Sequence, residues 1–318
     1  MSNYYLDFEE PVKLIDTQLI KLKSEQNPSA EELKQIDLLE IKKKKTLKKI
    51  FAHLSRWQKV QLARHPQRPY TKDYINYISP NFIELHGDRH FADDAAVICG
   101  IGSLNGRSVA LMGQQKGRNT KDNLKRNFGM MRPDGYRKSL RIMKLAEKFN
   151  LPVITLIDTS GAYPGIGAEE RGQGEAIARN LWEMSKLKVP IISVVIGEGA
   201  SGGALGIGLC DRMLMLENTW YSVISPEGCA SILWHDSLKA KDAADAMQVA
   251  PMDLKKMGIC DRIIKEPLGG AHRNQKETME NLKNILMEEI NEFDGIDPRE
   301  YLEKRIARYE KMGVYTES

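Results

Sequence analysis

The chain has 318 residues, of which 47 are Lys or Arg and 43 are Asp or Glu, giving a formal net charge of +4. Such a chain can bury a sizeable core, its balanced charge argues against a nucleic-acid-binding protein, and no apolar run is long enough to span a membrane. We expect no secretory signal, because the first residues lack a basic region followed by an apolar core. Four scattered cysteines without a C-x-x-C pair favour a cytoplasmic protein with reduced thiols and no zinc of its own (Cys99, Cys210, Cys229 and Cys260).

The first predicted elements are charged amphipathic helices over residues 8–65. Leu47, Ile50 and Leu54 recur at three- and four-residue spacings between charged positions. The lysine run 42–45 could form a nucleic-acid-binding arm, but a solvated helix face balanced by neighbouring acids is favoured. We therefore expect residues 1–70 to be an N-terminal helical segment.

The core is expected to begin as a β-hairpin, because Asn105-Gly106 separates two strand-like runs, 96–104 and 107–115. A basic stretch follows, containing Lys116, Arg118, Lys121, Lys125 and Arg126, which could contact the phosphates of a ligand or the acidic surface of a partner protein, or form a solvated face. A helix over 134–149, opened by Pro133, then leads to a strand at 153–157.

The rest of the core repeats strands and helices. The expected elements are a helix at 169–185, strands at 191–196, 213–216 and 261–264, and helices at 240–249 and 253–257. This order predicts a parallel α/β core over 71–274, although the pattern cannot distinguish a doubly wound sheet from a β-superhelix. Residues 275–318 should form a C-terminal helical segment outside it.

The glycine-rich turn after residues 191–196 is the most informative feature. Gly202 and Gly203 stand where a helix would begin, so their N–H groups could bind an anionic oxygen in a phosphate cradle or an oxyanion hole. Residues 197–202 also fit G-x-G-x-x-G, but only about ten residues separate them from the next strand, which is short for a dinucleotide fold. A third interpretation is that the glycines only permit close packing.

Eight motifs occur in register along the chain. They are R-P-x-x-x-D-Y (68–74), L-H-G-D-R (85–89), R-N-F-G-M (126–130), I-D-T-x-G-A-Y-P-G (157–165), G-A-E-E-R-G-Q (167–173), S-G-G-A-L (201–205), S-V-I-S-P-E-G (222–228) and E-P-L-G-G-A-H (266–272). Together they resemble the carboxyltransferase alpha-subunit family of bacterial acetyl-CoA carboxylase over nearly the whole chain.

The resemblance implies a crotonase-like α/β fold, a superhelix of β-β-α units. It implies transfer of CO₂ from carboxybiotin, borne by the biotin carboxyl carrier protein, to acetyl-CoA, giving malonyl-CoA for fatty-acid biosynthesis. The expected partner is a zinc-ribbon beta subunit in an α2β2 complex, with biotin carboxylase in the wider assembly. Gly202 and Gly203 would form this subunit's oxyanion hole facing carboxybiotin, and Gly161 and Ala162 would line the same cleft.

Two positions depart from the family pattern: Ser160 stands in place of proline, and Ala200 in place of a further glycine. Ala200 fits only if its backbone needs no positive φ. His86, His272 and Glu198 could be acid–base groups, but structural roles are favoured for all three. The competing functions are a stand-alone acyl-CoA hydratase or isomerase, which needs paired carboxylates beside the glycines, and a non-catalytic scaffold.

Overall fold

We describe residues 4–25 and 27–313 of a computed structural model of the chain. Its centre is an eight-stranded sheet in the order β1-β2-β3-β4-β5-β6-β8, with the short β7 paired to the end of β5. The strands are β1 (Ile83–Glu84), β2 (Val97–Leu104), β3 (Arg107–Gln114), β4 (Val153–Thr159), β5 (Ile191–Ala200), β6 (Arg212–Leu216), β7 (Trp220–Ser222) and β8 (Arg262–Ile264).

The predicted hairpin and parallel core are both confirmed. Strands β2 and β3 pair antiparallel with Leu104 opposite Arg107, and Asn105 and Gly106 between them take φ values of 49° and 84°. Those positive angles are the ones a two-residue type I′ turn requires. Strands β3 to β6, and then β8, pair in parallel.

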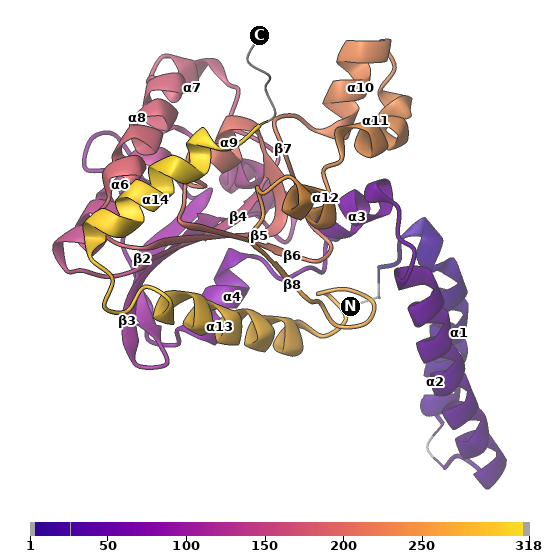
Figure 1. Cartoon of the computed structure of the whole chain (residues 1–318). Helices are drawn as coiled ribbons and strands as arrows, with labels where there is room; N and C mark the ends of the chain where they lie inside the picture. Colours follow the sequence, from indigo (N-terminus) through magenta and orange to yellow (C-terminus); the bar gives the residue numbers. More distant parts are fainter. Residues whose placement is uncertain (1–3, 26, 314–318) are drawn as a thin grey trace.

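Helices cover both faces of the sheet (Figure 1). One face carries α4 (Thr71–Ile78) and α13 (Gln275–Asn291); the other carries α6 (Pro133–Lys148), α8 (Gln173–Lys186) and α14 (Pro298–Glu310). Alternate residues of each strand enter the two cores: Val153 packs with the α6 and α8 side, whereas Ile154 packs with the α4 and α13 side.

The N-terminal helices α1 (Glu10–Lys23) and α2 (Ala30–Phe51) form a hairpin that projects from the body of the molecule (Figure 1). Ile15, Leu19 and Leu39 bury one another between the two helices. Of the lysine run 42–45, only Lys43 is partly covered, where it pairs with Asp16 at 2.6 Å. The next helix, α3 (Arg56–Ala63), packs against β5 and α11 (Ala240–Met247).

Two predicted elements differ from the structure. The helix expected at 169–185 is divided into α7 (Ile166–Glu169) and α8, because Gly172 between them adopts a left-handed φ of 79°. The strand expected to end at 196 runs on to Ala200, because residues 198–200 pair with β7. Within the described residues, no helix is both long and apolar enough to cross a membrane.

The remaining helices follow the strands that carry the site. They are α5 (Thr120–Lys125), α9 (Ser201–Leu205), α10 (Pro226–Trp234), α11 (Ala240–Met247) and α12 (Pro251–Lys256). Helices α10 and α11 rise from the same end of the molecule as α9 (Figure 1). That end is where the parallel strands β4 and β5 finish, so the following loops meet there.

Candidate functional site

The turn from β5 into α9 has the geometry that the sequence predicts. Strand β5 is buried along its whole length and α9 begins at Ser201, so Gly202 and Gly203 lie in the first helical turn. First-turn N–H groups have no acceptor within their own helix and remain available to an anionic oxygen. Gly203 is buried and Gly202 is partly exposed, so the turn opens toward solvent at one side.

The loop after β4 lies directly against this turn. A Cβ built on Gly203 would be 2.2 Å from the Gly161 carbonyl carbon and 2.6 Å from the Ala162 nitrogen. Only glycine permits so close an approach of two backbone segments. The structure therefore brings together all four residues expected to form the site, and it gives the absence of a side chain at Gly203 a specific reason.

The two predicted loop residues are not equivalent. The Gly161 N–H donates to Thr159 Oγ1 at 3.2 Å, and the same hydroxyl donates to the Gly161 carbonyl at 2.8 Å. The Ala162 N–H has no such partner among the residues that the structure describes. Ala162 is therefore the better placed of the two to donate to a substrate oxygen.

Gln114, at the end of β3, fixes both segments. Its side chain is fully buried, donates to the Gly203 carbonyl at 3.0 Å and accepts the Asp158 N–H at 3.1 Å. Asn180, on α8, donates to the Gly206 carbonyl at 2.9 Å. These bonds hold the carbonyl side of the glycine turn, so the N–H side is left facing outward.

A buried charge cluster lies beside the turn. Lys116 Nζ is 2.7 Å from Asp158 Oδ1 and 2.7 Å from Glu198 Oε2, and Arg64 pairs with the other Glu198 oxygen. Burial alone would raise the pKa of Glu198, but the charges of Lys116 and Arg64 lower that pKa to about 2. Burial would likewise lower the pKa of Lys116, yet the two carboxylates raise it above its usual value. Glu198, Lys116 and Arg64 are therefore charged at neutral pH.

This arrangement corrects our interpretation of the basic stretch 116–126. Lys116 is neither solvated nor free to bind a phosphate, because its ammonium group pairs with the two carboxylates. Arg118 pairs with Asp73, and Arg126 pairs with Asp122 at 2.9 Å. Glu198 fits the expected structural role. A cavity of about 280 Å³ opens beside the cluster, lined by Ala63, Arg64, Tyr70, Lys116, Asn123, Phe128, Ser160 and Glu198.

The two departures from the family pattern are both accommodated. Ala200 has a φ of −115°, so its Cβ causes no backbone strain. The positive angle falls instead on Ser201, whose φ is 56° and whose side chain is exposed at the helix start. Ser160 is exposed at the rim of the cavity, where an extra hydroxyl costs little.

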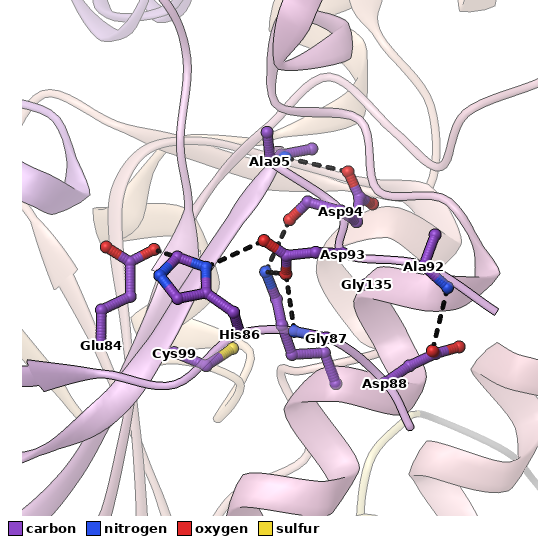
Figure 2. Close-up of polar contacts among 12 residues, drawn as sticks. Glu84, His86, Gly87, Asp88, Ala92, Asp93, Asp94, Ala95, Cys99 and Gly135 are labelled. Carbon is purple, nitrogen blue, oxygen red and sulfur yellow. Dashed lines mark hydrogen bonds and ion pairs between the residues drawn. The ribbon is translucent and has the colours of Figure 1, made fainter. Parts of the chain in front are cut away.

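The two histidines differ from each other. Figure 2 shows His86 held by Asp93, with Nδ1 at 2.9 Å from Oδ2, while Lys138 Nζ is 2.6 Å from the other Asp93 oxygen. The structural hydrogen bond expected of His86 is therefore present. Among the described residues, neither ring nitrogen of His272 has a hydrogen-bond partner; the ring is buried and stacks on His65 with centroids 3.7 Å apart. His272 therefore fits a structural role through packing, without the hydrogen bond that His86 makes.

Glu9, His65 and His272 could together offer a metal ion three ligand atoms, which lie within 4.8 Å of one another. Their present bonds do not favour one. His65 Nδ1 accepts the Gln67 N–H at 3.2 Å, and Glu9 pairs with Arg273 at 2.7 Å. A cation would have to displace these bonds beside a fixed guanidinium, so the sequence-based expectation of no metal on this chain stays a prediction.

Comparison with known proteins agrees with this geometry. The family described as acetyl co-enzyme A carboxylase carboxyltransferase-like matches residues 5–313. The chain belongs to this family. It is 54% identical over 316 residues to the acetyl-coenzyme A carboxylase carboxyl transferase subunit alpha of Xanthomonas axonopodis pv. citri, covering 99% of each chain. The subunit of the same name from Chlorobium luteolum is 52% identical over 331 residues, again covering 99% of each chain.

Solved structures support the fold. A Pseudomonas malonate decarboxylase hetero-tetramer in complex with coenzyme A superposes with a TM-score of 0.59 at 14% identity, covering 74% of this chain and 93% of that one. Transcarboxylase 12S superposes with a TM-score of 0.54 at 19% identity, covering 67% of this chain and 41% of that one. The predicted crotonase-like architecture is therefore confirmed, and the dinucleotide-binding alternative is excluded. The chain is a carboxyltransferase subunit of acetyl-CoA carboxylase.

Proposed function

We propose that this chain provides one oxyanion hole for the transfer of CO₂ from carboxybiotin to acetyl-CoA, which yields malonyl-CoA for fatty-acid biosynthesis. The observation that supports this proposal is the close contact between Gly203 and the 161–162 peptide, because it brings the backbone of the two segments together. Backbone donors suit this step because negative charge develops on oxygen as the carboxyl group leaves.

Biotin, attached to the carrier protein, supplies the transferable carboxyl group. Gly202 and Gly203 donate their N–H groups to the ureido oxygen on which charge develops, and Ala162 contributes from the facing loop. Fixed amide donors at such a position contribute about 3–4 kcal/mol each to transition-state stabilisation. The residues present fit this role, because the turn offers N–H donors without side chains and Gln114 holds its carbonyl side in place.

The alternative of an acyl-CoA hydratase or isomerase has no support at the site. The two carboxylates beside the turn, Asp158 and Glu198, are both paired with Lys116, and Glu198 also pairs with Arg64. Neither is available as an acid or base for the acyl chain. The alternative of a non-catalytic scaffold is tested directly by the variants described below.

An apolar surface on α10 and the segments on either side of it supports a beta-subunit partner. Its large side chains are more than 60% exposed at Val223, Ile232, Leu233 and Leu238, at the same end of the molecule as the glycine turn (Figure 1). Exposed apolar patches of this kind mark interaction sites. We propose that the beta subunit covers this surface in an α2β2 complex and supplies the second oxyanion hole. The assembly would act in the cytoplasm with carrier protein and biotin carboxylase.

Reconstitution tests the proposal. The purified chain, the beta subunit and biotinylated carrier are combined singly and together, and malonyl-CoA formation is followed. Activity is expected only when both subunits are present, and Leu233→Glu should weaken assembly at least tenfold. Malonyl-CoA formation by this chain without the beta subunit would refute the two-hole arrangement.

A further inference from the structure

Strands β4 and β5 end in the two segments that form the site, and a single cation joins them. Asp158 lies near the end of β4 and Glu198 near the end of β5, and Lys116 Nζ is 2.7 Å from a carboxylate oxygen of each. Asp158 also accepts the Glu198 N–H at 3.1 Å. Gly203 lies five positions after Glu198, and Gly161 lies three after Asp158.

We propose that Lys116 is a positioning residue that sets the distance between the 161–162 peptide and the Gly202–Gly203 turn. This inference rests on the proposed function, because it assumes that these two segments face one substrate oxygen. The Lys116 side chain is 14% exposed and both of its partners are less than 10% exposed, so little water can replace the ammonium. Without it, two carboxylates of like charge would face each other and separate the strand ends.

Further contacts constrain the positions of Lys116 and Glu198. The Lys116 side chain supports the loop at Gly129, where an added Cβ would lie 3.1 Å from Lys116 Cγ. Arg64, which directly follows α3, pairs with the second oxygen of Glu198 and also with Glu227 on α10. The cluster therefore links the glycine turn to α10, the helix of this chain that we propose the beta subunit covers.

A second buried ion pair in the same fold provides a matched control. Arg305, on α14, pairs with Asp211 at 2.7 Å, with both side chains at most 5% exposed. Asp211 accepts the Ile191 N–H, so this pair fixes the start of β5, at the opposite end of the strand from the glycine turn. Because Arg305 also donates to three backbone carbonyls, its loss should lower Tm at least as much as loss of Lys116, but only loss of Lys116 should disturb the site.

The experiment compares Lys116→Met, Lys116→Arg and Arg305→Met in the reconstituted complex, measuring kcat, KM for the carboxylated carrier, affinity for the beta subunit and Tm. Lys116→Met is expected to lower kcat about 10- to 100-fold with KM within about threefold, since a displacement near 1 Å has that effect. Lys116→Arg should restore part of the rate. Arg305→Met should lower Tm at least as much while kcat at 20 °C stays within about twofold.

Three outcomes would overturn the proposal: a lowered Tm with wild-type kcat, a raised KM with unchanged kcat, which would indicate substrate contact, or the same kcat loss in Arg305→Met. If Lys116→Met does not assemble, Glu198→Gln replaces it, with an expected three- to tenfold loss of kcat; a wild-type kcat for this variant also overturns the proposal. The wild-type complex tests the proposed function separately, because absence of malonyl-CoA formation there would refute that function and not the role of Lys116.

Discussion

A pair of glycine-to-alanine variants separates backbone geometry from the presence of amide donors. Both Gly202→Ala and Gly203→Ala keep the N–H group that would bind the oxyanion. At Gly203 the new Cβ would lie 2.2 Å from the Gly161 carbonyl carbon and 2.4 Å from its oxygen. At Gly202 the nearest atom is Ile177 Cδ1 at 3.3 Å, the end of a flexible side chain.

The expected magnitudes follow from these distances. Ordinary contact begins near 3.4 Å, so Gly203→Ala must displace the loop after β4 by about 1 Å, which typically costs about 100-fold in rate, or about 2.7 kcal/mol. Gly202→Ala needs only a small side-chain adjustment and should cost less than about tenfold. Malonyl-CoA formation by the reconstituted complex is the assay, with Tm and assembly measured alongside.

Two results would refute this reasoning. One is a Gly203→Ala complex that assembles and retains more than half of the wild-type rate, which would show that contact with the 161–162 peptide is irrelevant to catalysis. The other is equal loss in the two variants at equal Tm, which would assign the effect to the turn as a whole.

Further predictions concern strain, pH, histidine and metal. Ser201 has a left-handed φ of 56°, which glycine adopts without strain, so Ser201→Gly should have a Tm at or above that of the wild type in thermal melting. Ser201→Ala should show no increase in Tm. The pKa of Glu198 is lowered to about 2 in the folded chain from 4.5, so its contribution to stability is present above pH 4.5 and is lost as pH falls toward 2. Chemical unfolding should therefore show stability falling over this range, and Glu198→Gln should make the fall smaller. His86→Asn should keep kcat within about threefold in the malonyl-CoA assay, because His86 is bound to Asp93. Elemental analysis of the isolated chain should find well under one zinc per chain, and one per chain would contradict the prediction.

Local signals in the sequence predict the longer strands and the position of the glycine turn, but not the short strands β1 and β7. Asn105-Gly106 strongly favours a β-hairpin because two strand-like runs flank it. The parallel strands were predicted from short β-branched runs between helices. Gly202 and Gly203 were singled out because two adjacent glycines stand where a helix was expected to begin, and the structure starts α9 at Ser201. Their role as oxyanion donors stays a prediction. The end of β5 was placed too early because its last residues pair with β7, which is a tertiary contact.

The difference in hydrogen bonding between the Gly161 and Ala162 N–H groups could not be predicted for a different reason. Both residues lie in one motif, and only the Thr159 hydroxyl, which occupies the Gly161 N–H, distinguishes them. Likewise, a positive φ was considered at Ala200 but occurs one residue later, at Ser201. A one-residue shift in where a strand turns into a helix depends on packing at both ends of the turn, and no single residue type encodes it.

The charge cluster had a signal that could have been used. Asp158 and Glu198 each follow a strand-like apolar run, and the carboxyl ends of neighbouring parallel strands meet at one edge of a sheet. Two carboxylates buried at such an edge need a cation, since an unpaired buried charge costs several kcal/mol. The basic stretch after the hairpin starts at the end of the strand next to them, so Lys116 was the nearest candidate. The basic stretch is not a single surface: its first residue, Lys116, is buried, whereas Arg118 and Arg126 form ion pairs near the surface. Treating all five basic residues alike therefore missed the pairing of Lys116.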